Sequence, residues 1–290
     1  MGVKKAKYWK KKGEVVFCDL CIFQCSFEDK SSGKCFCRVC INGELMTATY
    51  AKISTTKLCF TPEVPLINEQ NMKWFTAGGL GCNLRCPGCS FQTLAFSNPL
   101  APQVTYRKIP PEKLVEKAEF NYCKGICFSF NEPFMMVEYV LEVFEIAKAK
   151  GLKTALFTNG LAKTCATEDM TKVCNHFIVD IKGFSKSVYK SLTGEWISLE
   201  DIAPSLELIK ASPSNLELVT VVVPRFNDSF FEIKSLTRWI RYRIGKDTPW
   251  HIMPFVPSHG LYYLNPTPPD TLLKVAKIAH EEGLSRVIVH

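Results

Sequence analysis

Residues 218–223, Leu-Val-Thr-Val-Val-Val, form the stretch that decides the fold class. A continuous apolar run rich in β-branched residues is typical of a strand buried on both faces, as in a parallel sheet. Comparable strand-like stretches occur at 73–80, 125–130, 153–157, 176–181, 216–223, 250–255 and 285–289. Helical patterns separate them, near 111–119, 134–149, 167–174, 199–211, 228–243 and 268–281.

This alternation of strands and helices predicts an α/β fold with right-handed crossovers. Six or so strand–helix units would make a partial (β/α)6 barrel of the TIM type, and a doubly wound sheet is the alternative. In both folds the active residues gather at the carboxyl ends of the strands. We therefore expect functional side chains directly after the predicted strands.

The composition sets the class of protein. Hydrophobic residues make up 47% and charged residues 22% of the 290 residues, which predicts a buried core and excludes global disorder. No apolar run reaches the roughly 18 residues that a membrane span needs, and the lysine-rich start lacks signal-peptide features. A cytoplasmic location is the expectation. In a reducing compartment, the 14 cysteines point to metal ligands or catalytic groups.

The chain divides into two predicted parts. Segment 1–65 combines a lysine-rich start, a cysteine-rich module that a metal would organise, and a connector around 61–65 that contains two prolines. Segment 66–290 carries the barrel pattern.

The formal net charge of +8 comes largely from six lysines at positions 4, 5, 7, 10, 11 and 12. A flexible, solvated terminus is the favoured interpretation of these lysines, and a nucleic-acid-binding tail is the alternative.

The strongest chemical signal is a cysteine triplet at 78–89, Gly-Gly-Leu-Gly-Cys-Asn-Leu-Arg-Cys-Pro-Gly-Cys. Cys82, Cys86 and Cys89 have the spacing C-x3-C-x2-C directly after a predicted strand. Three thiolates can hold three irons of a four-iron cluster and leave one iron open to another ligand. The alternative is a zinc site that a remote cysteine completes.

A second cysteine group lies nearer the N-terminus. Cys18, Cys21, Cys25 and Cys35 have the spacing C-x2-C-x3-C-x9-C. Four cysteines can close a structural zinc site or hold an auxiliary iron–sulfur cluster, and a segment this short needs such help to fold. Both metals remain open, as does the role of the nearby cysteines at 37 and 40. The scattered cysteines at 59, 123, 127, 165 and 174 are expected to be small buried hydrophobes.

The triplet and several shorter motifs resemble the radical SAM superfamily. Within it, the sequence is similar to pyruvate formate-lyase activating enzymes, and most of all to the group called AmmeMemoRadiSam system radical SAM enzymes. The resemblance runs from about Cys18 to the end of the chain, so that 66–290 would be the radical SAM core domain. The matching motifs, in order, are 130–133 (Phe-Asn-Glu-Pro), 157–160 (Phe-Thr-Asn-Gly), 179–183 (Val-Asp-Ile-Lys-Gly), 222–224 (Val-Val-Pro), 227–228 (Asn-Asp) and 249–251 (Pro-Trp-His).

The resemblance implies an oxidoreductase that cleaves S-adenosylmethionine reductively at a [4Fe–4S] cluster. The resulting 5′-deoxyadenosyl radical would abstract a hydrogen atom from the substrate, while the protein positions the cofactor and excludes water. The substrate would be a glycyl-radical protein or a small molecule. A low-potential reductant such as a ferredoxin or flavodoxin would be a partner.

Six side chains are candidates for cofactor binding. Glu132 ends a predicted strand and could accept a hydrogen bond from the cofactor's amino group, or simply stabilise a helix N-terminus. Asp180 and Lys182 alternate along a strand and so face the same side. The resemblance assigns both to cofactor binding, and an ion pair at the barrel rim is the alternative. The remaining candidates are Thr158, Asn159 and His251, for which turn chemistry or burial in the core are the alternatives.

Two further classes of function compete with the enzyme. The chain could be a zinc-dependent, cysteine-rich module that binds nucleic acid, or an iron–sulfur electron carrier without SAM chemistry. The strand–helix array after Cys89 and the concentration of basic residues at one terminus disfavour the first. An electron carrier would not need Glu132, Asp180 and Lys182 around its cluster.

Overall fold

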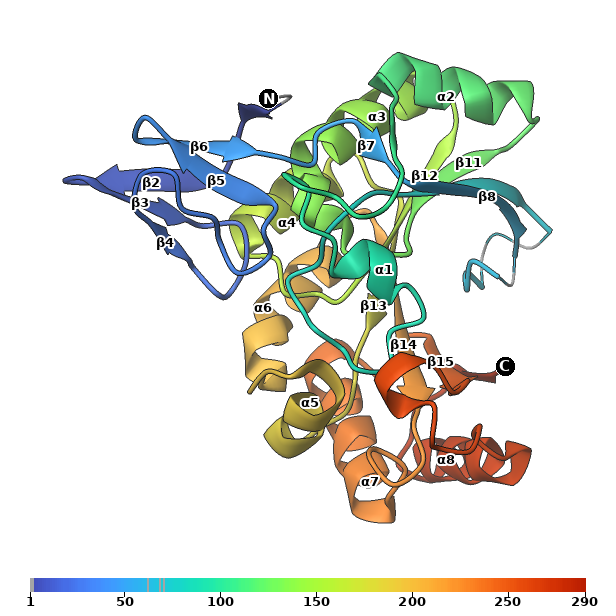
Figure 1. Cartoon of the computed structure of the whole chain (residues 1–290). Helices are drawn as coiled ribbons and strands as arrows, with labels where there is room; N and C mark the ends of the chain where they lie inside the picture. The colour runs from blue at the N-terminus through green and yellow to red at the C-terminus, as the bar shows by residue number, and fades with distance from the viewer. Residues whose placement is uncertain (1–2, 62, 68, 70) are drawn as a thin grey trace.

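The computed structural model describes residues 3–61, 63–67, 69 and 71–290, and it has an eight-stranded sheet at its centre (Figure 1). In spatial order the strands are β16 (Val287–Val289), β15 (Trp250–Pro254), β14 (Asn215–Val222), β13 (His176–Asp180), β12 (Lys153–Thr158), β11 (Gly125–Phe128), β9 (Lys73–Gly78) and β8 (Thr55–Phe60). All neighbouring pairs from β16 to β9 are parallel, and β8 is antiparallel to β9. The predicted α/β class with a parallel sheet is therefore confirmed.

The strand order follows the chain order from β9 to β16, which differs from the reversal in a doubly wound sheet. Among the described strands, β8 and β16 are unpaired on their outer sides, so the sheet stays open. Side chains from five adjacent strands pack together on one face, namely Trp74, Cys127, Ala155, Ile178 and Val219. An open parallel sheet whose strands follow the chain order, with one apolar cluster on its inner face, has the arrangement of a partial barrel.

Helices connect the parallel strands. They are α2 (Pro111–Phe120), α3 (Val137–Ala149), α4 (Thr164–Thr171), α6 (Leu199–Ala211), α7 (Phe230–Trp239) and α8 (Pro269–Glu281), close to the predicted ranges. A further helix, α5 (Lys186–Thr193), was not predicted from the sequence. Ser185 caps its start, and Gly194, with φ of 80°, ends it. Within the described part of the chain, no helix has the length and apolar character to cross a membrane.

The N-terminal residues form a lobe of short strands beside α3 and α4 (Figure 1). The strands are β1 (Lys4–Lys5), β2 (Trp9–Lys12), β3 (Val15–Cys18), β4 (Ser26–Phe27), β5 (Arg38–Ile41) and β6 (Glu44–Thr47), in two antiparallel sheets. The lysine-rich start is therefore not the flexible terminus that the sequence suggested. Lys4 and Lys5 pair with β6, and Lys10 forms an ion pair of 2.7 Å with Asp19.

The segment after the lobe leads into the central sheet. β7 (Lys52–Ile53) pairs with β10 (Arg107–Lys108), and the chain continues directly into β8. Although β8 lies within the predicted segment 1–65, it pairs along its whole length with β9. Residue 62 of the predicted connector lies outside the described residues, whereas Val64 and Leu66 are buried in the cluster on the inner face of the sheet.

A buried ion pair joins the lobe to the barrel. The Arg38 guanidinium donates to Glu138 Oε1 on α3 at 2.7 Å and to the carbonyl of Lys7 at 2.7 Å. Both charged side chains are almost fully buried, with relative exposures of 1% and 3%. Glu138 also accepts from the Lys7 amide at 2.8 Å. A charge pair out of contact with water depends strongly on both partners, so this pair is an anchor of the lobe.

A second contact fixes the lobe to the loop that follows β12. Cys21 forms an antiparallel bridge with Ala162. The amide of Ile22 donates to the Leu161 carbonyl at 3.1 Å, and the Lys163 amide donates to the Leu20 carbonyl at 2.9 Å. The lobe therefore contacts the loop that begins with Asn159, directly after Thr158 at the end of β12, and both of these residues are predicted to bind the cofactor.

Candidate active site

A cavity of about 400 Å³ lies at the carboxyl ends of the parallel strands. Its lining includes eight of the residues singled out in the sequence: Cys82, Cys86, Cys89, Glu132, Thr158, Asn159, Asp180 and Lys182. They come from the loop after β9 and from the ends of β11, β12 and β13. The fold thus brings together residues that are up to about a hundred positions apart in the chain.

The cysteine loop is held in shape by Asn131. Its side-chain oxygen accepts from the Gly79 amide at 3.0 Å, and its side-chain nitrogen donates to the Gly81 carbonyl at 2.8 Å. Gly81 has φ of 88°, and a Cβ atom there would lie 2.2 Å from the sulfur of Cys37. Within the loop, the Leu84 amide points at Cys82 Sγ from 3.4 Å. The backbone therefore needs both the glycine and the asparagine to present the thiols.

Glu132 is the most strongly organised carboxylate in the cavity. Its Oε1 accepts from Thr158 Oγ1 at 2.7 Å and from the Phe134 amide at 3.1 Å, and its Oε2 accepts from the Asn159 amide at 2.9 Å. The side chain is buried. Burial raises the pKa of Glu132 to about 7, although the three hydrogen bonds oppose the shift. A nearby cation would favour the ionised form.

Asp180 and Lys182 form an ion pair in the same cavity. Lys182 Nζ lies 2.5 Å from Asp180 Oδ2, while Asp180 Oδ1 is buried without a hydrogen-bond partner among the described residues. Burial alone would lower the pKa of Lys182, but the Asp180 carboxylate and the thiols of Cys86 and Cys89 together raise it. The pair therefore keeps a positive charge beside the cysteine loop and an acceptor open to a further donor.

Asn83 connects the cysteine loop with two other parts of the chain. Its side-chain oxygen accepts from Asn159 Nδ2 at 2.7 Å. Burial raises the pKa of the Cys21 thiol to about 12. A hydrogen bond between the Asn83 side chain and this thiol partly opposes the rise. Asn159 Oδ1 meanwhile accepts from the Leu161 amide at 3.1 Å. Both polar ends of the Asn159 side chain are thus occupied in fixing loops.

His251 lies elsewhere. It is buried near the start of β15, where its Nε2 is 2.5 Å from Glu217 Oε2 and its Nδ1 is 2.8 Å from His290 Nε2. It does not belong to the residues that line the cavity. The contact with Glu217, which lies two residues before the register partner of His251 on β14, holds the ring inside the sheet rather than at the carboxyl ends of the strands.

The N-terminal cysteines gather in the lobe. Burial is the main cause that raises the pKa of Cys18 to about 11. The nearby thiols of Cys35 and Cys25 raise it further. The Arg38 guanidinium opposes that rise, because a buried cation favours the thiolate. Cys37 donates a hydrogen bond that lowers the pKa of Cys35.

The triplet cysteines are half-buried in the lining of the cavity. Burial is the main cause that holds the pKa of Cys82 well above its usual range. The Glu132 carboxylate and the Cys86 thiol raise this pKa further. Within the described residues, no three Cys, His, Asp or Glu side chains are already arranged around one point as a single bound ion would require. A four-iron cluster binds each thiolate through a different iron, and three thiols on one loop that face one cavity fit this donor set.

Two residues that organise the site, Asn83 and Asn131, were not among the predicted site residues, although Asn131 belongs to the matching motif at 130–133. Both had a visible signal, since one sits inside the cysteine motif and the other precedes Glu132 at a strand end. Their roles could not be predicted because each depends on contacts between loops that are distant in the chain.

The buried carboxyl group of Glu132 makes stability depend on pH. A carboxyl pKa near 7 in the folded state, against 4.5 in the unfolded state, means that the unfolded chain loses its proton first as the pH rises. We expect wild-type protein without added ligands to lose about 2 to 3 kcal/mol of unfolding free energy between pH 5 and pH 8 relative to a Glu132→Gln variant. Urea unfolding across this range measures the difference.

The matched control for that measurement is Glu14→Gln, because the Glu14 side chain is 98% exposed and should not show such a difference. Equal pH slopes in wild-type protein and in Glu132→Gln would contradict the predicted shift.

Comparison with protein families gives a match to the radical SAM superfamily over residues 78–236. The chain is 24% identical to the pyruvate formate-lyase-activating enzyme of Streptococcus mutans, over 70% of this chain and 82% of that enzyme. It is 27% identical to the uncharacterized protein MJ0808 of Methanocaldococcus jannaschii, over 99% of this chain and 85% of that protein.

Solved structures support the same fold. A radical SAM methyltransferase from Sphaerobacter thermophilus superposes with a TM-score of 0.55 at 13% identity, covering 83% of this chain and 77% of that one. QueE from Escherichia coli gives 0.52 at 12% identity, covering 83% and 94%. At these identities the likeness concerns the fold alone.

Proposed function

Since the chain belongs to the radical SAM superfamily, we propose that its cavity at the carboxyl ends of the strands binds the [4Fe–4S] cluster and S-adenosylmethionine that this family implies. The observation that carries the proposal is the meeting of three thiols from one loop with Glu132, Asp180 and Lys182 in one cavity. The family match makes the protein an enzyme.

Cys82, Cys86 and Cys89 would be the cluster ligands. No further cysteine belongs to the described lining of the cavity, so one iron would remain open to the cofactor. Amides near the thiols, such as that of Leu84, would help to stabilise their negative charge. Bound in this place, the cluster and cofactor supply a reductive cleavage that yields a 5′-deoxyadenosyl radical for hydrogen abstraction.

Glu132, Asp180 and Lys182 would orient the methionine part of the cofactor. The Glu132 carboxylate and the free Oδ1 of Asp180 are acceptors suited to its ammonium group. The Lys182 ammonium is a donor suited to its carboxylate, while Asp180 holds the lysine in place. Thr158 and Asn159 would act through Glu132, to which both donate hydrogen bonds. His251 has no part in this set, because it lies outside the cavity.

Aromatic side chains would protect a reactive species from solvent. Phe91, which follows the cysteine motif, packs edge-on against Phe130 with ring centroids 4.9 Å apart, and both rings line the cavity. Phe255 and Leu261 line it as well. Apolar walls exclude water and competing hydrogen donors.

The relatives named as activating enzymes favour a protein substrate, and we propose hydrogen abstraction from a glycyl-radical enzyme as the specific activity. A ferredoxin or flavodoxin would supply the electron. The competing interpretations, a zinc-dependent nucleic-acid-binding module and a simple electron carrier, are not favoured by the cavity, which assembles polar groups suited to an amino acid beside the cysteines.

Anaerobic reconstitution with iron and sulfide tests the proposal. With S-adenosylmethionine and dithionite, the reconstituted protein should form 5′-deoxyadenosine and methionine in equal amounts, as measured by liquid chromatography. A protein that binds four irons yet forms no 5′-deoxyadenosine would contradict the assignment.

We further propose that Cys18, Cys21, Cys25 and Cys35 bind a metal distinct from the catalytic cluster. The Cys18 and Cys35 thiols lie near the buried Arg38 guanidinium, a cation that would offset the negative charge of thiolates. The lobe buries apolar side chains such as Val16, Phe27 and Leu45 in the same cluster as the main core, and a bound metal would add to its stability. Zinc would make the site structural, and iron with sulfide would make it an auxiliary cluster.

A variant in which alanine replaces Cys82, Cys86 and Cys89 should therefore retain metal after anaerobic purification without chelators. Elemental analysis and sulfide determination then decide between zinc and an iron–sulfur cluster. Further replacement of Cys18 and Cys35 with serine should remove that metal, whereas serine at the exposed Cys165 should not. A triple variant free of metal would refute the second site.

A further inference from the structure

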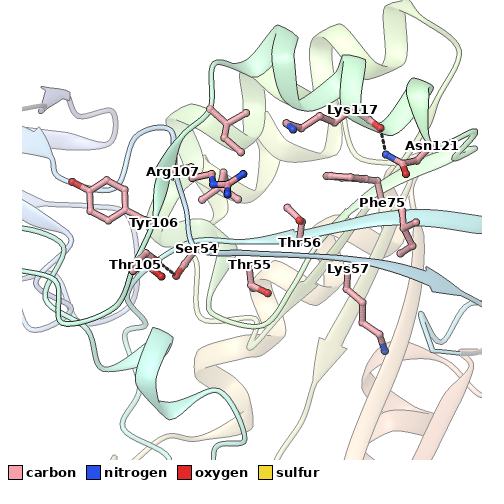
Figure 2. Close-up of a pocket in the computed structure, with 13 residues that line it drawn as sticks. Ser54, Thr55, Thr56, Lys57, Phe75, Thr105, Tyr106, Arg107, Lys117 and Asn121 are labelled. Carbon is pink, nitrogen blue, oxygen red and sulfur yellow. Dashed lines mark hydrogen bonds between the residues drawn. The ribbon is translucent and has the colours of Figure 1, made fainter.

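A second cavity, of about 820 Å³, lies along the outer side of β8 (Figure 2). Its lining includes the consecutive residues 54–58, together with residues next to β10 and the last part of α2. It shares no lining residue with the cavity that contains the cysteine triplet. This groove is therefore separate from the proposed active site.

The backbone of β8 has an open hydrogen-bonding edge in this groove. The Thr61 amide donates to the Met72 carbonyl at 3.2 Å, so the polar groups of Thr61 point toward the strand that contains β9. The Lys73 carbonyl points the other way and accepts a hydrogen bond on the β11 side of β9. Because successive residues of a strand point their polar groups to opposite sides, those of Thr56 and Leu58 point away from β9. In the part of the chain that the structure describes, no strand pairs with β8 on that side.

The groove is positively charged. Lys57, Arg107 and Lys117 belong to its lining, which contains no Asp or Glu. Figure 2 shows Arg107 and Lys117 on the α2 side of β8 and Lys57 on the other side. Lys57 is paired with Glu63, but no carboxylate of the described residues forms an ion pair with Arg107 or Lys117. Two cations thus remain available to an acidic ligand.

Apolar side chains complete the groove and its borders. Phe75 and Ile109 line it on the α2 side, and Leu58 is 39% exposed at its edge. β10 closes one end, because it pairs with β7 directly before β8 begins, and Ser54 Oγ donates to the Thr105 carbonyl there at 2.7 Å. The free edge is therefore short and bounded, which suits one extended segment.

We infer that β8 is a docking edge for an extended, acidic segment of a partner protein. The segment would add a strand to the sheet through the outward N–H and C=O groups of Thr56 and Leu58. Its carboxylates would pair with Arg107 and Lys117. Nucleic acid fits less well, because phosphates accept hydrogen bonds but do not donate to the two outward carbonyls. A second copy of this edge would bring like charges together.

The test uses the full-length protein and fluorescence anisotropy. The probe is a labelled eight-residue peptide that alternates glutamate and valine, and we expect saturable binding that weakens as salt is added. Methylation of alternate backbone nitrogens in the peptide should weaken binding by about fivefold or more, since it removes donors to the edge. A single-stranded oligonucleotide of equal charge should bind more weakly than the peptide.

Variants locate the binding to the groove. Thr56→Pro removes one outward donor at an edge position that tolerates proline, and should weaken peptide binding by about fivefold, whereas Thr56→Val should not. Arg107→Gln combined with Lys117→Gln should weaken it by about fivefold to tenfold at low salt, whereas Lys113→Gln, on α2 but outside the lining, should not. Circular dichroism checks the fold of each variant.

Four results would overturn the inference: no peptide binding, binding unaffected by the charge variants, equal binding of the methylated peptide, or preference for the oligonucleotide. Self-association in sedimentation experiments that Thr56→Pro abolishes would assign the edge to a second copy instead. The readout needs neither cluster nor cofactor, so these failures leave the proposed SAM chemistry untouched.

Discussion

Replacement of Cys82, Cys86 or Cys89 with alanine is expected to reduce 5′-deoxyadenosine formation to the level seen without protein. Each thiol would bind a different iron, so two remaining thiols cannot secure a cluster that also leaves an iron open to the cofactor. The cavity offers no substitute among its described lining residues, which contain no other cysteine or histidine. Chromatography after anaerobic reconstitution, together with iron determination, measures both consequences.

Cys165→Ala is the matched control, since this cysteine is exposed on α4 and belongs to neither cysteine group. It should keep wild-type iron content and turnover. Substantial product from a variant that lacks all three triplet cysteines would show that the cluster is held elsewhere.

Loss of the buried Arg38 guanidinium should have the largest effect on stability. In an Arg38→Met variant, the Glu138 carboxylate would remain buried without its charged partner, which typically costs about 3 to 5 kcal/mol. Burial would otherwise lower the pKa of Arg38, but Glu138 and the nearby Cys18 and Cys35 thiols raise it, so the cation is well matched to its surroundings. Urea unfolding should show the loss as a lower midpoint.

Two comparisons make this result specific. Adding Glu138→Leu to Arg38→Met removes the unpaired charge and should restore much of the lost stability. Lys150→Met breaks an exposed pair with Glu119, where the side chains are 42% and 41% accessible, and should change stability by no more than about 1 kcal/mol. Equal effects of the buried and the exposed replacement would contradict the anchoring role of Arg38.

The sequence predicted the sheet well because its strands are local apolar runs. The stretch 218–223 lies almost wholly within β14, and each of the other predicted strands overlaps an observed one. The short α5 was missed because an amphipathic eight-residue helix leaves little periodicity, although its Ser185 cap and Gly194 end were visible. The lysines at the start were misjudged because their pairing with β6 depends on residues some forty positions later.

The candidate site was predictable where a motif specified it. Position after a strand was enough for Glu132, Asp180 and Lys182, because parallel strands bring their carboxyl ends to one edge. The same reasoning did not bring His251 to the cavity, since a strand also carries side chains well below its end. The contacts of Asn83 join loops after β9 and β12 with the lobe, and no local pattern encodes them.

The bridge between Cys21 and Ala162 has a consequence for biogenesis. Translation proceeds from the N-terminus, so the ribosome completes the cysteine-rich lobe long before it makes the loop on which the lobe rests. Until residues 161–163 have emerged, Leu20 and Ile22 lack their hydrogen-bonding partners. The strand bridge at Cys21 therefore forms only after more than half of the chain has been made, and docking of the lobe on this loop is a late step in folding.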